Sequence, residues 1–119
     1  MRQVFEIPGR FPSLNEFYRM QPYQQGRVKR ECDDRVARCA KAAGIVPYTR
    51  PVRYRCTWVE ENRRRDLDNV AFGKKFVQDG LVKAGVLAND THHEIIGFED
   101  AFAYDGRNPH VVVEIWDER

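Results

Sequence analysis

The alternation of hydrophobic and polar residues predicts several short strands along the chain. Residues 2–7 (RQVFEI) alternate and end at a Pro-Gly pair, and residues 52–61 (VRYRCTWVEE) place Val, Tyr, Cys and Trp on one face of an extended segment. Residues 93–104, which we expect to be broken near Gly97, and residues 110–116 have the same character. The pattern therefore indicates four strands.

Between the first two strands the hydrophobic residues recur at helical spacing. Ser13, with Glu16 three residues later, has the pattern of a capping box for a short helix, which we expect to end at the Pro and Gly of residues 21–26. Small and apolar residues then recur every three or four positions over residues 27–43. This second helix is expected to end at Gly44.

A third helix is predicted over residues 68–84, capped by Asp68 and ended by Gly85. Its buried stripe would contain Phe72, Phe76, Val77 and Leu81. The resulting order, approximately β-α-α-β-α-β-β, predicts an α+β (mixed α/β) fold in which helices pack on one small mixed sheet. At 119 residues the chain is expected to form a single domain over residues 1–119.

Composition narrows the class of protein. With 42% hydrophobic and 32% charged residues, no apolar run near the roughly 20 residues of a membrane span and no signal-peptide core, we expect a cytoplasmic protein with no membrane partner. Its three cysteines form no CxxC pair, which favours reduced thiols.

The distribution of charge points to a partner. Residues 1–89 carry 18 Lys and Arg against 10 Asp and Glu, whereas residues 90–119 carry 2 against 8. A basic body favours a polyanionic partner such as nucleic acid, although folding can also mix these charges over an ordinary surface.

Both signs of charge are concentrated in residues 63–75, RRRDLDNVAFGKK. In an extended segment the side chains of Asp66 and Asp68 would share a face, with backbones about 6.6–7 Å apart, and could reach one cation. Mg²⁺ and Mn²⁺ prefer such oxygen ligands. Alternatively, the two aspartates are acidic residues placed at a helix N-terminus, where they interact favourably with the helix dipole.

A third acid for this site would be Asp90, which follows the predicted helix 68–84. A helix of about 17 residues is roughly 25 Å long, so Asp90 would lie at the end distant from Asp68. Either the segment after Gly85 runs back antiparallel to the helix, or the site is shared with another chain. Asp90 also fits an ordinary turn aspartate after Asn89.

Two lysines and two histidines lie close to these acids. On a continuous helix Lys75, seven residues after Asp68, returns to the same face, whereas Lys74 does not. Lys75 could neutralise charge on a phosphate, or form only a surface pair with an acid one turn further on. At most one of the adjacent His92 and His93 could contribute, because neighbouring side chains in a strand point to opposite faces.

The elements D-x-D-N, K-x-x-x-D-x-L, A-G-V-L and N-D follow one another in residues 65–95, and this stretch resembles the RusA-type endodeoxyribonucleases, the Holliday-junction resolvases of phages and prophages. The likeness extends more loosely to IPGRFPSLNE in residues 7–16. It implies a small α/β homodimer that binds four-way DNA junctions and cuts two symmetric strands with Mg²⁺ or Mn²⁺, in DNA recombination and repair.

Carried over residue by residue, the resemblance assigns Asp66, Asp68 and Asp90 as the catalytic and metal-binding acids. The K-x-x-x-D-x-L element aligns the catalytic lysine with Lys75, although counting from D-x-D-N reaches Phe72, since VAFGKK carries three extra residues. The DNA-binding residues expected beside them are Arg63, Arg64, Arg65, Lys74 and Asn15.

The function expected from this site is metal-assisted hydrolysis of DNA phosphodiesters at a four-way junction. Three alternatives remain at the level of sequence. They are a non-catalytic accessory protein of the same fold that binds branched DNA, a metal nuclease acting on flaps or single strands, and a phosphohydrolase acting on small molecules.

Overall fold

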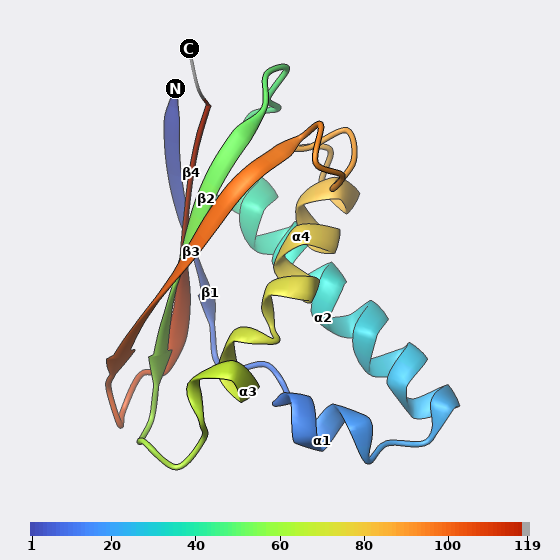
Figure 1. Cartoon of the computed structure of the whole chain (residues 1–119), viewed down its shortest axis with the longest axis vertical. Coiled ribbons are helices and arrows are strands. Elements are labelled where there is room, and N and C mark those ends of the chain that lie inside the picture. Colours follow the sequence, from blue (N-terminus) through green and yellow to red (C-terminus); the bar gives the residue numbers. More distant parts are fainter. Residues whose placement is uncertain (118–119) are drawn as a thin grey trace.

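The structure is a computed structural model that describes residues 1–117. Its four strands are β1 (Arg2–Pro8), β2 (Val52–Glu60), β3 (Ile95–Tyr104) and β4 (His110–Asp117). They form one sheet in the order β1-β4-β2-β3, in which β2 and β3 are parallel and the other neighbours are antiparallel. The helices lie on one face of this sheet (Figure 1), so the predicted α+β class with a small mixed sheet is confirmed.

The face of the sheet that meets the helices forms the core. Alternate residues of β2, namely Val52, Tyr54, Cys56 and Trp58, are buried on this face, as their spacing predicts. The core is completed by alternate residues of β1 and β4 and by apolar residues of the helices, among them Phe5, Ile7, Val36, Phe76, Val77, Leu81, Val111, Val113 and Ile115.

The first two helices are α1 (Leu14–Tyr18) and α2 (Pro22–Ala42). The predicted capping box of α1 is present, because the Ser13 hydroxyl accepts from the Glu16 amide at 3.2 Å and the Glu16 carboxylate accepts from the Ser13 amide at 2.9 Å. Helix α2 begins at Pro22, earlier than predicted. A proline at the first helical position costs no hydrogen bond, so the residue expected to end one helix begins the next.

The helix predicted over residues 68–84 is in fact two helices, α3 (Leu67–Ala71) and α4 (Lys74–Lys83). The break falls at Gly73, where an added Cβ would lie 3.0 Å from Trp58 and 3.1 Å from Phe11. Only a residue without a side chain allows the chain to turn this close to the core. The observed order is therefore β-α-α-β-α-α-β-β, and the prediction of one continuous helix is wrong.

Strand β3 lies at one edge of the sheet and is not broken at Gly97. Instead its pairing with β2 shifts there, since Val52 pairs with Ile95 but Arg53 pairs with Gly97. On the face without helices the strands carry charged side chains that pair with one another, as Arg55 does with Glu99 at 3.1 Å. No helix within residues 1–117 is long and apolar enough to cross a membrane.

Candidate functional site

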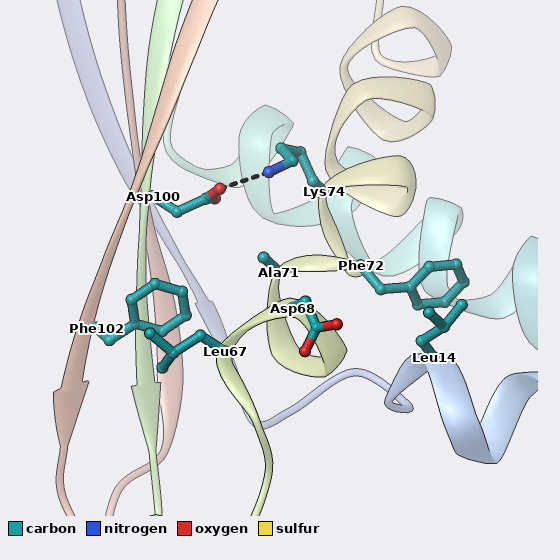
Figure 2. Close-up of a pocket in the computed structure, with 8 residues that line it drawn as sticks. All are labelled: Leu14, Leu67, Asp68, Ala71, Phe72, Lys74, Asp100 and Phe102. Atoms are coloured by element: carbon teal, nitrogen blue, oxygen red, sulfur yellow. Dashed lines mark hydrogen bonds and ion pairs between the residues drawn. The ribbon is translucent and has the colours of Figure 1, made fainter.

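An open depression of about 500 Å³ lies between α1, α3, α4 and β3 (Figure 2). It is at the end of the sheet where β2 and β3 finish. It is lined by Leu14, Leu67, Asp68, Ala71, Phe72, Lys74, Asp100 and Phe102. Five of these residues are apolar and three are charged. The depression therefore combines an acid of the predicted site with a lysine and with an apolar surface.

Lys74 is held on this depression by Asp100. Its Nζ donates to Asp100 Oδ2 at 2.5 Å (Figure 2). Trp58 Nε1 donates to the other oxygen, Asp100 Oδ1, at 2.9 Å. The two charged side chains are only 20% and 19% exposed, and Lys74 also lies over the Phe98 ring at 4.4 Å. Asp100 is thus fixed on two sides and positions the ammonium group of Lys74.

The aspartates of the D-x-D stretch lie at the start of α3. Asp66 is the N-cap residue with an extended backbone, and Asp68 lies in the first turn. Both are exposed, and Asp68 Oδ1 accepts only from the neighbouring Asn69 amide, at 3.0 Å. Of the acids predicted from the sequence, Asp68 is the one that lines the depression with Lys74.

Lys75, the lysine favoured by the sequence, does not line the depression. Its side chain is 57% exposed and lies 3.5 Å from Asp79, one helical turn further on. The expectation for Lys75 assumed one helix from Asp68 onward, and the break at Gly73 changes the direction in which later side chains point. The geometry therefore favours Lys74 for a role beside Asp68.

Asp90 lies in the segment between α4 and β3, where its carboxyl group is close enough to that of Asp79 to affect its pKa. The segment after Gly85 thus runs back along α4, but only as far as the middle of that helix. Lys74 and Asp79 are separated by about 7.5 Å of helix axis. Among residues 1–117, no three His, Cys, Asp or Glu side chains gather as a group that could hold a metal ion.

Lys29 of α2 holds Asp79 in place. Its Nζ lies 2.5 Å from Asp79 Oδ2 and 2.6 Å from Asp33 Oδ2. Burial raises the pKa of Asp79, but the hydrogen bond from Lys29, together with the interaction with the neighbouring Asp90, outweighs this effect and keeps that pKa below its ordinary value. Burial raises the pKa of Asp33, and the bond from Lys29 only partly opposes it. This basic residue of α2 therefore joins two helices.

The arginines before Asp66 differ in what they contact. Arg63 is exposed and stacks on the Tyr104 ring at 4.6 Å, and Arg64 is exposed as well. Arg65 instead donates to the Phe11 carbonyl at 3.0 Å and pairs with Glu16. Arg63 and Arg64 thus remain accessible to a ligand, whereas Arg65 ties the segment before α3 to the start of α1.

The remaining predicted residues lie on the surface. Asn15 is exposed on α1, at the same end of the sheet as α3 (Figure 1). His92 and His93 lie in a turn before β3, with their rings 4.2 Å apart, and neither lines the depression. A residue that the sequence reasoning missed is Asp100, whose partners Trp58 and Lys74 are distant in the chain. The only sign of this role in the sequence is an acidic residue within a strand that is otherwise largely apolar.

The acids near the depression could supply only a few of the ligands of a divalent cation. Both oxygens of Asp100 are engaged by Trp58 and Lys74, whereas the carboxylate of Asp68 is exposed. Mg²⁺ is commonly held by one or two carboxylates, with waters and substrate phosphates as the other ligands. Asp68, with Asp66 beside it in sequence, would hold the ion in this chain, and Asp90 of the same chain does not join them.

Comparison with known proteins adds no relative. A scan against protein-family models finds none that matches the chain, and a search of curated proteins finds no match either.

Proposed function

We propose that this protein is a metal-dependent endodeoxyribonuclease that resolves four-way DNA junctions by paired phosphodiester hydrolysis, in recombination or repair of phage or prophage type. The observation that carries the proposal is that Asp68 and Lys74 line one open depression. Two exposed arginines, Arg63 and Arg64, come shortly before Asp68 in the chain. An acid that can hold a metal ion thus shares a surface with a cation that can hold the phosphate, and two exposed cations precede it in the chain.

Each group of the depression has a part in this chemistry. The Lys74 ammonium, held by Asp100, offsets negative charge that develops on the phosphate during hydrolysis. Asp66 and Asp68 supply carboxylate oxygens for Mg²⁺ or Mn²⁺. The bound ion would lower the pKa of a water molecule and stabilise charge on the phosphate.

DNA would be bound through its phosphates at the end of the sheet that carries α1 and α3 (Figure 1). Arg63, Arg64 and Asn15 are exposed there and can contact the backbone without reading its sequence. Binding should therefore weaken steeply as salt is raised. We place the protein in the cytoplasm, with access to this substrate.

We further propose a homodimer, because a two-fold assembly presents two equivalent sites to the two equivalent strands of a junction. Asp90 of one protomer would then join Asp66 and Asp68 of the other in one metal site. This would bring together the three acids that lie apart within a single chain.

A second candidate function is a non-catalytic protein that binds branched DNA. It is favoured by the same separation of the acids, since residues 1–117 contain no group of three that could hold a metal. Under this function the exposed arginines would bind DNA, and the pair of Lys74 and Asp100 would serve only to stabilise the fold.

Cleavage of labelled DNA tests the proposal. The protein is incubated with a four-way junction, a flap and a linear duplex of matched sequence, each with Mg²⁺, with Mn²⁺ or with EDTA. We expect paired cuts in the junction with either ion, little cutting of the duplex and none in EDTA. Junction binding without cutting under any condition would favour the second candidate, and hydrolysis of small phosphate esters alone would exclude both.

The two lysines provide a sharper prediction. Lys74→Met should lower junction cleavage by about 100-fold, because the positioned charge near the phosphate is lost. Lys75→Met removes an equal charge from an exposed surface pair, so its effect should stay within about 3-fold. Single-turnover cleavage of the same junction measures both. A larger loss in Lys75→Met than in Lys74→Met would contradict the role assigned to Lys74.

A further inference from the structure

Hydrolysis of a phosphodiester does not account for the apolar part of the depression. Leu67 and Phe102 line its β3 side, Leu14 and Phe72 line its α1 side, and Ala71 lies between them (Figure 2). Leu67 is 52% exposed although it lies between the two aspartates of the D-x-D stretch. Apolar side chains exposed in a concave surface commonly mark a ligand site.

A phosphate is not the ligand that these apolar walls fit. The charged residues of the lining are two carboxylates, of Asp68 and Asp100, and one ammonium group, of Lys74, which Asp100 already pairs. A phosphate would find a cation only at the Lys74 end of the depression or at the nearby exposed Arg63 and Arg64, and the apolar walls would give it no hydrogen bonds. The group that packs between the apolar walls must therefore be uncharged and largely apolar, and it must be attached to a phosphate that the nearby cations hold.

A nucleobase has this chemistry. Its flat faces stack on aromatic side chains, a contact worth about 1–3 kcal/mol per base, and also pack against aliphatic ones. Its edge carries hydrogen-bond donors and acceptors, and Lys74 retains donors beyond the one it gives to Asp100. In a nucleotide the base and the phosphate are joined through one sugar, so a phosphate near Asp68 would bring its own base to the walls beside it.

We propose that the depression receives an unpaired nucleobase of the DNA, with its faces against the Leu67–Phe102 and Leu14–Phe72 walls and its edge toward Lys74 and Asp100. The inference rests on the proposed function only in that DNA is the ligand. A base within a duplex has both faces stacked, and extracting it costs a few kcal/mol, least where pairing is already interrupted. The depression thus selects branched DNA, where bases at the branch are easiest to unstack, over linear duplex.

Fluorescence of 2-aminopurine tests this inference without any need for cleavage. The probe replaces the base at the branch of a four-way junction, or the same position of a linear duplex, and protein is added to saturation with Ca²⁺ in place of Mg²⁺. We expect the fluorescence to rise in the junction, because the base leaves its stack, and to stay constant in the duplex.

Two variants locate the effect. Ala71→Leu fills the space between the walls without removing a charge, and Leu67→Ser removes one wall at an exposed position, so it leaves the core intact. Both should abolish the rise, and Leu67→Ser should weaken junction binding by about 5-fold or more. Ala42→Leu, at the exposed end of α2, adds the same volume elsewhere and should behave as the unmodified protein.

The outcomes separate the inference from the proposed function. Two results would overturn the nucleobase site. One is a fluorescence increase with saturating Leu67→Ser that equals the increase with the unmodified protein, and the other is no increase when the unmodified protein is bound to the junction. A rise that Leu67→Ser abolishes, in a protein that never cuts DNA, supports the nucleobase site and overturns only the nuclease. Failure to bind any DNA overturns both.

Discussion

Replacing Asp68 by Asn should lower junction cleavage by about 1,000-fold while junction binding persists. The carboxylate of Asp68 is exposed and lines the depression, and its one hydrogen bond, from the Asn69 amide, can also be accepted by an asparagine. The variant should therefore fold normally and lose only the charge that would hold the ion. Loss of a negative charge should, if anything, strengthen the attraction for DNA.

Single-turnover cleavage and a gel-shift titration of the same junction measure the two effects separately. Asp34→Asn is the matched control, since it removes the same charge from a surface pair between α2 and Lys83 of α4, and neither residue lines the depression. It should change cleavage by less than about 3-fold. Cleavage at the normal rate by Asp68→Asn would overturn the assignment of Asp68.

The same variant can show whether Asp90 acts in its own chain. Because Asp68 and Asp90 do not gather in one chain, we expect a site that combines them to draw each from a different protomer. Asp68→Asn and Asp90→Asn should each be inactive alone. Co-expressed with different tags and purified as a mixed dimer, they should regain one intact site and nick one strand of the junction. A mixed dimer without any activity would place both acids in the same chain's site.

Local signals in the sequence were sufficient for most of the fold. The capping box of Ser13 and Glu16 forms as predicted, because it depends on residues within one turn. Gly44 and Gly85 end their helices with positive φ values of 72° and 77°, which is also a local property. The alternation in residues 52–60 identified the buried face of β2 for the same reason.

The errors lie where distant parts of the chain meet. Gly73 breaks the predicted helix because Trp58 and Phe11 lie against it, and no pattern within residues 68–84 reveals those neighbours. The helical argument for Lys75 over Lys74, though not the K-x-x-x-D-x-L alignment, assumed that continuous helix. Asp100 was missed because its role depends on Trp58 in β2 and Lys74 in α4, which only the folded sheet brings together.

The two acids of the D-x-D stretch, in contrast, could be proposed from sequence because their relation is local. Asp66, not Asp68 as predicted, is the N-cap residue of α3, and its side chain makes no capping hydrogen bond. Asp68 lies in the first turn, so both alternatives stated for them, a metal ligand and a helix N-terminus, are compatible with the structure. The position of Asp90 beside Asp79 depends on the path of the segment after Gly85, which brings it back to α4 and which no local pattern predicts.

Gly80→Ala should lower the free energy of unfolding by about 3 kcal/mol, although alanine is the better helix former. Gly80 is buried in α4 where this helix crosses α2, and an added Cβ would lie 2.4 Å from Val36 Cβ and 3.0 Å from the Asp33 carbonyl oxygen. Val36 is itself fully buried, so neither helix can yield without opening the core. Urea unfolding followed by circular dichroism measures the loss.

Gly26→Ala is the matched control, because Gly26 also lies within a helix but its added Cβ would meet only the flexible end of Arg30, at 3.5 Å. It should stabilise the protein by about 0.5–1 kcal/mol, so the two substitutions should have opposite signs. Equal effects would show that α2 and α4 do not pack this closely. The α2–α4 contact places Lys29 on Asp79, beside Asp90, whereas Lys74 is held from β3. The rate of cleavage per folded molecule of Gly80→Ala should therefore fall if Asp90 takes part in the reaction, and should stay unchanged if it does not.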